Sequence, residues 1–161
     1  MQQGKLRRLW LAAAAALMLP MMATVGSGTA HATPEQCDRK NAVFPAWHEP
    51  AGVEVEHWGR KARVMNDSIG DETSHGAFFQ GRESGDLIWV DRSINRIPAS
   101  YPKYISTADV QANGGWKQCG PFGTSSGETD HVTAVDYAIR VCIRPSGRDS
   151  KCSDSWVIDE R

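Results

Sequence analysis

The sequence has 161 residues, a formal net charge of −1 at neutral pH and 23% charged residues. This length suits one domain and excludes a two-domain enzyme. The mild acidity of the chain argues against a nucleic-acid binder, because such a protein needs a basic face to neutralise phosphates.

A secretory signal peptide is predicted over residues 1–32. Three basic residues precede the apolar run from Leu9 to Leu19, and Ala30-His31-Ala32 has the small-x-small pattern of a cleavage site. An apolar run of about eleven residues is too short to span a bilayer. We therefore predict cleavage near Ala32/Thr33, secretion of a single domain covering residues 33–161, and no membrane span.

The composition after cleavage favours an all-β fold. Residues 33–161 contain ten valines and eight isoleucines but one leucine, Leu87. β-Branched side chains fit a pleated, half-buried sheet, whereas leucine is the usual residue of helical cores. The same segment has 15 Lys and Arg against 19 Asp and Glu, which gives a net charge of −4. We predict a small antiparallel sandwich or partly closed barrel that is monomeric in solution.

Strand patterns begin at Val53. Residues 53–58 alternate apolar and polar, as in a strand with one solvated face, and residues 62–65 form a second candidate strand. Residues 66–74 are predicted as a polar loop. The run from Leu87 to Val90 is apolar without alternation, which predicts a central strand buried on both faces.

The middle of the chain is predicted to be less regular. Pro98 and Pro102 exclude an internal strand over residues 93–106, because proline cannot donate a ladder hydrogen bond. Residues 107–113 predict one or two helical turns. Thr107 is the expected cap at the start, and the two glycines that follow residue 113 end the helix.

Four cysteines in a small exported domain predict two disulfides. If Cys142 and Cys152 face each other across a C-terminal hairpin, Gly147 lies at its tip. The same register places Arg140 opposite Asp154 and Ala138 opposite Trp156, which pairs opposite charges and a small residue with a large one. We therefore predict the disulfide Cys142–Cys152, which leaves Cys37–Cys119.

Three tryptophans are candidate ligand-binding residues. Trp47, Trp58 and Trp116 lie beside polar, turn-rich sequence. An aromatic ring combines a broad apolar face with a polar edge, as carbohydrate-binding surfaces require. The leading functional prediction is a non-enzymatic extracellular module that binds carbohydrate or cell-envelope material.

Two other functions remain open. The proline-braced segment 94–98 presents Arg96 and would suit an inhibitor of a trypsin-like protease, with an extracellular protein as its partner. The enzyme alternative is a small secreted hydrolase that uses His and Glu or Asp. No catalytic residue is assigned, because Gly123–Gly127 matches G-x-S-x-G without the preceding strand and following helix that this motif needs.

No metal or other cofactor is predicted. The segment 67–75 carries Asp67, Asp71, Glu72 and His75, but these residues lack the spacing of a calcium loop. The histidines after the signal peptide form no pair at i, i+4. We interpret the acidic residues of this segment as solvated loop charge.

Two segments resemble a family of small secreted actinobacterial modules. The segment from Gly85 to Ser93 matches a G-D-x-[IV]-W-[LV]-D-R-S block, and the segment from Ala138 to Trp156 resembles the family's closing hairpin, A-[LI]-R-x-C…C-x-x-W. The resemblance implies an exported, disulfide-bonded β module with an accessory role, and it transfers no catalytic residues. After Ser93 the chain departs from the family's Asp-Gly-Gly. On physical grounds, Asp91 and Arg92 are expected to pair with neighbours and fix a sheet edge.

Overall fold

A computed structural model describes residues 31–32, 37, 39–40, 48–67, 73–122 and 127–158 of the chain. The predicted signal peptide lies outside these residues, apart from His31 and Ala32, which form the short strand β1. Trp47, Asp71, Glu72 and residues 123–126 also lie outside them. Within the described ranges, no helix is long and apolar enough to cross a membrane.

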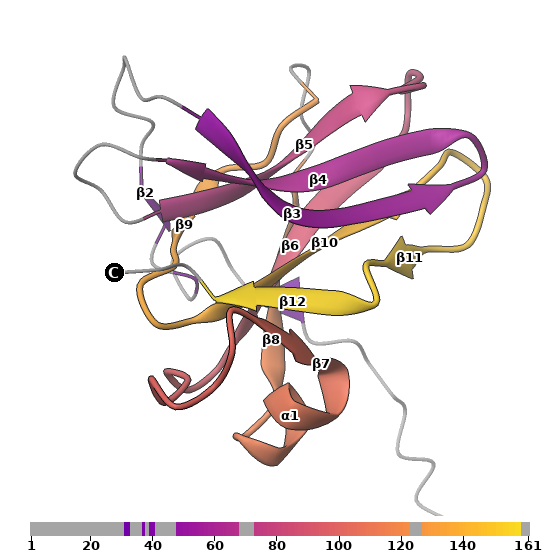
Figure 1. The fold of residues 1–161 in the computed structure, drawn as a ribbon. Helices are drawn as coiled ribbons and strands as arrows, with labels where there is room; N and C mark the ends of the chain where they lie inside the picture. The colour runs from indigo at the N-terminus through magenta and orange to yellow at the C-terminus, as the bar shows by residue number, and fades with distance from the viewer. Residues whose placement is uncertain are drawn as a thin grey trace, which may run out of the picture.

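The described strands form two sheets that do not close into a barrel, and the predicted all-β fold is confirmed (Figure 1). The order of one sheet is β2-β9-β5-β4-β3, and that of the other is β1-β8-β6-β10-β12-β7, with β11 also paired to β10. All pairs are antiparallel except β1 with β8. The elements are β1 (His31–Ala32), β2 (Arg39–Lys40), β3 (His48–His57), β4 (Arg60–Asp67), β5 (Thr73–Gln80), β6 (Leu87–Ser93), β7 (Tyr104–Ser106), α1 (Thr107–Ala112), β8 (Trp116–Phe122), β9 (His131–Thr133), β10 (Ala138–Arg144), β11 (Lys151–Cys152) and β12 (Ser155–Ile158).

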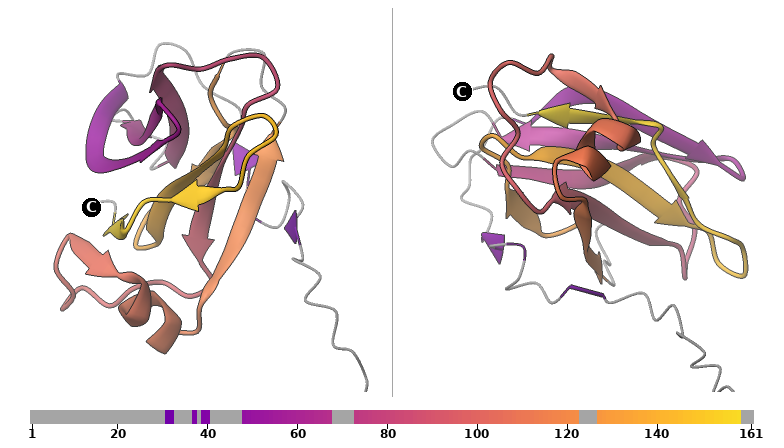
Figure 2. Two further views of the ribbon diagram at one scale, coloured as in Figure 1. Left: turned by 90° about the vertical axis from the view of Figure 1, so that its right-hand side faces the viewer. Right: turned by 90° about the horizontal axis from the view of Figure 1, so that it is seen from below.

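The main core lies between the two sheets. Its fully buried members include Val64 of β4, Val90 of β6 and Val141 of β10. A Cβ atom added to Gly76 of β5 would lie 3.1 Å from the Val141 side chain and 3.2 Å from that of Val90. Glycine at this position therefore allows β5 to approach the opposite sheet closely. In the left view of Figure 2, the indigo-to-magenta strands lie beside the orange and yellow strands.

The predicted alternation of apolar and polar residues from Val53 onwards is confirmed. Val53 and Val55 are buried while Glu54 and Glu56 are exposed, so β3 has one core face and one solvated face. Trp58 was expected within this strand, but it lies in the turn that follows it. The predicted central strand is β6, which lies between β8 and β10.

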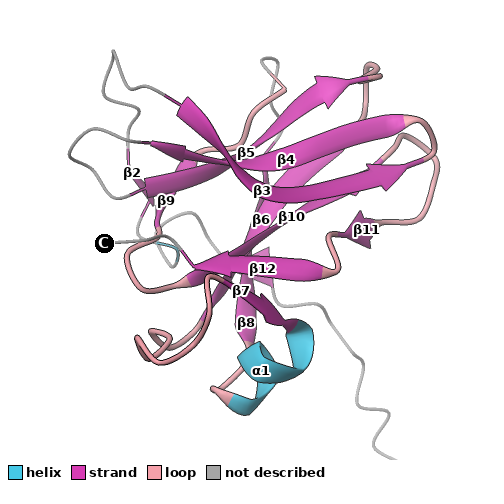
Figure 3. Cartoon of the chain, in the orientation of Figure 1, coloured by secondary structure: helices cyan, strands magenta, loops and turns pink. Residues whose placement is uncertain are grey.

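A second, smaller core lies beside α1, at the end of the molecule where Figure 3 shows the helix. Ser106, and not Thr107, caps this helix. The Ser106 hydroxyl accepts a hydrogen bond from the Asp109 backbone N–H, and the Asp109 carboxylate accepts one from the Ser106 backbone N–H. Thr107 Oγ1 instead accepts a hydrogen bond from Trp156 Nε1 at 3.1 Å.

Both predicted disulfides are confirmed. Cys37–Cys119 joins Cα atoms 5.8 Å apart, and Cys142–Cys152 links β10 to β11. The predicted hairpin register also holds for Ile143 and Lys151 but is wrong beyond Cys152, because Asp154 lies outside the strands and Ala138 lies opposite Ile158 rather than Trp156. Ser153 and Asp154 lie outside both strands, so the pairing shifts by two residues between β11 and β12.

Candidate functional site

The turn between β3 and β4 displays the most exposed tryptophan of the described residues. Its two central residues, Trp58 and Gly59, have φ values of +50° and +75°. His57 and Arg60 pair on either side of them. Positive φ at both positions matches a type I′ turn, which favours Asn-Gly because bulky side chains are strained there. Trp58 nevertheless occupies the first position with 55% of its surface exposed.

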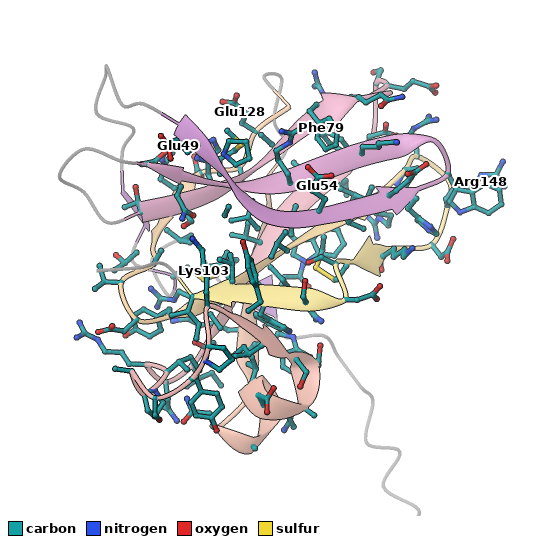
Figure 4. All side chains as sticks on the ribbon, viewed as in Figure 1. Glu49, Glu54, Phe79, Lys103, Glu128 and Arg148 are labelled. Carbon is teal, nitrogen blue, oxygen red and sulfur yellow. A yellow bond between two sulfur atoms is a disulfide. The ribbon has the colours of Figure 1, made fainter. Side chains whose placement is uncertain are left out.

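The turn between β10 and β11 holds the Trp58 ring in place. Trp58 Nε1 donates a hydrogen bond to Asp149 Oδ1 at 3.1 Å, and His57 Nε2 lies 3.2 Å from the same oxygen. The Arg148 guanidinium lies 4.4 Å from the centroid of the Trp58 ring. The hydrogen bond from Trp58 lowers the pKa of Asp149 most, and a hydrogen bond from the Asp149 backbone N–H and the contact with His57 lower it further below its usual value. We call His57, Trp58, Arg148 and Asp149 the hairpin-tip surface; Figure 4 labels Arg148 at this end of the molecule.

An ion pair between the partly buried Arg60 and the buried Asp86 lies next to this surface. Arg60 Nη1 donates to the Trp58 carbonyl oxygen at 3.1 Å, and Arg60 Nε donates to Asp86 Oδ2 at 3.1 Å. The backbone N–H groups of Glu83 and Ser146 also donate to the Asp86 carboxylate, at 2.8 and 2.9 Å. Burial alone would raise the pKa of Asp86, but these hydrogen bonds and Arg60 lower it below the usual value. Asp86 thus connects the turn that carries Trp58 with its own turn at Glu83 and with the turn at Ser146.

Trp116 lies in a different environment from Trp58. It begins β8 beside α1 and is half-buried, with its ring centroid 5.6 Å from that of Trp156. The Arg140 guanidinium lies 4.8 Å from the Trp116 ring and 4.5 Å from the Trp156 ring. The structure therefore does not bring Trp58 and Trp116 onto one surface, and Trp47 lies outside the described residues.

The Arg96 segment is exposed and braced. Ile94, Asn95 and Arg96 are exposed, whereas Ile97 is buried. Asn95 Nδ2 donates to the Asn113 carbonyl oxygen at 2.9 Å, and Asn113 Nδ2 donates to the Arg96 carbonyl oxygen at 3.1 Å. These reciprocal amide contacts fix the backbone of the segment against the end of α1.

Asp91 and Arg92 make the expected pairings, but not at a sheet edge, because β6 is an internal strand. Arg140 donates to Asp91 Oδ2 from Nε at 2.9 Å and from Nη2 at 2.8 Å. Burial raises the pKa of Asp91, and Arg140 opposes this shift. Arg92 is buried with its guanidinium 4.3 Å from the Tyr137 ring. Both residues stabilise the interior of the sheet.

Both ends of the predicted polar loop 66–74 lie in strands instead, and they carry a buried cluster. Asn66 and Asp67 belong to β4, and Thr73 and Ser74 belong to β5. Asp67 Oδ1 lies 3.4 Å from His75 Nδ1, and Asp67 Oδ2 pairs with His131 Nδ1. The ring centroids of the two histidines are 4.4 Å apart. The interpretation of Asp67 as solvated charge is wrong, since its side chain is 3% exposed.

This cluster has no signature in the sequence, because its members come from three strands. The pairing of β5 with β9 puts Ser74 opposite Val132, which brings His75 next to His131 although 56 positions separate them in the sequence. No spacing within one segment carries that signal. Asp67 and His75 could have been suspected as the two ends of a hairpin.

Comparison with known proteins identifies no relative: no protein-family model, no curated protein and no solved structure matches this chain. The resemblance to secreted actinobacterial modules therefore stays a prediction.

Proposed function

We propose that this protein is an exported, non-enzymatic module that binds carbohydrate of the cell envelope or of extracellular polysaccharide through the hairpin-tip surface. One observation carries the proposal: Trp58 holds an exposed ring on a strained backbone. Strain of this kind costs about 1–3 kcal/mol and persists where the surrounding structure enforces it, commonly at functional sites. A more stable turn would need only Asn or Gly at this position.

The chemistry around Trp58 suits a sugar. An indole face stacks on the apolar C–H face of a pyranose ring, while its neighbours bind hydroxyl groups. Arg148 offers donors, and Asp149 offers acceptors beside the ring. Because Asp149 and Arg148 already fix the indole, little side-chain entropy is lost on binding.

Export is supported by the chemistry of the chain. Two disulfides form and persist in oxidising compartments such as the cell exterior. The N-terminal segment 1–32 has the charge and hydropathy pattern of a signal peptide. An exported module is also what the resemblance to actinobacterial modules implies.

Retention on insoluble polysaccharides and purified cell walls tests the proposal. We expect wild type to be retained on at least one of these materials and Trp58→Ala to be lost from it. Phe79→Ala is the matched control, because Phe79 is also an exposed aromatic residue but contacts Arg63 instead. No retention of wild type, or equal retention of Trp58→Ala, would overturn the proposal.

A protease inhibitor is the second candidate, favoured by the braced segment that presents Arg96. The Arg96 side chain is 65% exposed and its carbonyl oxygen is held by Asn113. A rigid exposed loop binds a protease cleft at low entropy cost. Inhibition of a trypsin-like protease by wild type, abolished in Arg96→Ala, would support this candidate; no inhibition by wild type would exclude it.

A further inference from the structure

Three side chains with metal-binding atoms converge on the outer face of the five-stranded sheet: Asp67 at the end of β4, His75 in β5 and His131 in β9. We propose that they bind one divalent transition-metal ion, with zinc as the preferred ion. This inference is independent of the proposed carbohydrate binding, since the hairpin-tip surface lies at the other end of the β3–β4 hairpin. Glu49, labelled in Figure 4, marks the end near the three ligands.

The strand registers place the three ligands on one face. Val64 and Gly76 lie opposite each other and face the other sheet, so the alternate residues of β4 and β5 point away from it. Asp67 and His75 are among these alternate residues. Val132 of β9 is buried in the core between the sheets, which puts its neighbour His131 on the same outer face.

The geometry of the donor atoms fits one ion. One metal-binding atom from each of Asp67, His75 and His131 lies within 4.8 Å of the other two. Ligands of a single zinc ion lie within roughly 4 Å of one another, given bonds of ~2.0–2.2 Å. Small rotations of these side chains are therefore enough to reach coordination distances. Each carboxylate oxygen of Asp67 already faces a different imidazole.

The site also has an orienting group. Thr73 Oγ1 donates a hydrogen bond to Asp67 Oδ2 at 2.6 Å. The two residues lie next to each other on the paired strands β5 and β4. Metal ligands are commonly held by such outer partners, which fix the ligand's orientation and tune its affinity. The buried Asp67 and His75 side chains restrict access of water, while His131 keeps 12% of its side chain exposed as a route of entry.

The donor set selects the class of metal. Two imidazoles and one carboxylate suit zinc and other first-row transition metals. Calcium prefers six to eight oxygen ligands, so the histidines disfavour it. Three protein ligands leave at least one coordination position for water or another ligand, whereas structural zinc sites use four protein ligands.

Zinc titration of the exported protein tests the proposal. The protein is purified without a polyhistidine tag, treated with EDTA and titrated with zinc sulfate by calorimetry. We expect one site, at least ~100-fold weaker binding in Asp67→Asn, His75→Gln and His131→Gln, and ~10–100-fold weaker binding in Thr73→Val. His57→Gln is the matched control for a surface histidine and should bind zinc like wild type.

Imidazole NMR of wild type covers the case in which a buried variant fails to fold. Zinc should shift the ring nitrogen signals of His75 and His131 and leave those of His57 in place. A hydrogen-bonded cluster without metal affinity predicts no binding at millimolar zinc, and that result would overturn the proposal. Loss of binding in His57→Gln alone, or NMR shifts confined to His57, would overturn it as well.

Discussion

Two regions of the molecule each combine an arginine, a tryptophan and an aspartate, but for different purposes. At the hairpin tip, Arg148 lies over Trp58, and Asp149 accepts a hydrogen bond from the indole. Beside α1, Arg140 lies over Trp156 and pairs with Asp91. Trp156 is fully buried whereas Trp58 is 55% exposed. Stability explains the interior group, but it does not explain an exposed indole on a strained turn.

The carboxylates of the two regions differ in the direction of their pKa shifts. Burial raises the pKa of Asp91 even though Arg140 opposes it. The hydrogen bond from Trp58 lowers the pKa of Asp149 at the exposed tip. Desolvation dominates in the interior, whereas hydrogen bonding to the charged form dominates at the surface. As the pH falls, Asp91 is therefore protonated at a higher pH than a free aspartate, and Asp149 at a lower pH.

Arg140→Ala should give the largest loss of stability. It leaves the buried Asp91 carboxylate without the guanidinium that donates two hydrogen bonds to Oδ2, so the free energy of unfolding should fall by about 3–5 kcal/mol. Arg148→Ala is the matched change at the tip and should cost no more than about 1 kcal/mol. Guanidinium denaturation followed by fluorescence measures both. Equal losses would show that the two regions do not differ as described.

Asp86→Asn should give an intermediate loss of stability that depends on pH. Asp86 accepts hydrogen bonds from two backbone N–H groups and Arg60, so removal of its charge should cost about 1–3 kcal/mol at pH 7. The folded pKa lies below the usual 3.8, so its contribution is complete above that value and is lost as the pH falls through the lowered pKa. Unfolding free energies of wild type and variant should therefore converge in acid. A constant difference down to pH 2 would contradict this origin.

The sequence predicted those features that depend on local pattern. Alternation identified β3, and the apolar run from Leu87 to Val90 identified the internal strand β6. A hairpin register with Gly147 at its tip identified the disulfide Cys142–Cys152. The hairpin register beyond this disulfide failed, because Ser153 and Asp154 leave the ladder and shift the pairing. A two-residue irregularity has no signature in the period-two pattern.

The candidate sites were less predictable, because they depend on conformation and on distant pairing. The alternating pattern assigned Trp58 to a strand, and only the following Gly59 signals the turn that exposes it. Asp67 and His75 were assigned to a loop, although both lie in strands. Their approach to His131 follows from the pairing of β5 with β9, which closes a long segment of chain and leaves no local trace.

Trp58→Asn separates stability from binding at the tip. Asparagine adopts positive φ more easily than tryptophan, so relief of backbone strain should offset the lost contacts with Arg148 and Asp149. The free energy of unfolding should stay within about 1 kcal/mol of wild type. Retention on the polysaccharide should be lost. A large fall in stability would assign Trp58 a structural role like that of Trp156.

Asp149→Asn should have the smallest effect on ligand binding, and it tests how far Asp149 fixes the orientation of the Trp58 indole. Asparagine can still accept a hydrogen bond from Trp58 but lacks the charge, so retention on the polysaccharide should weaken only a few-fold. In wild type, the lowered pKa of Asp149 keeps the carboxylate ionised through the mildly acidic range, and binding should weaken only as the pH falls below the usual value of 3.8. The variant should lack this acid-dependent step. Identical acid profiles for the two proteins would mean that Asp149 does not set the orientation in which Trp58 meets its ligand.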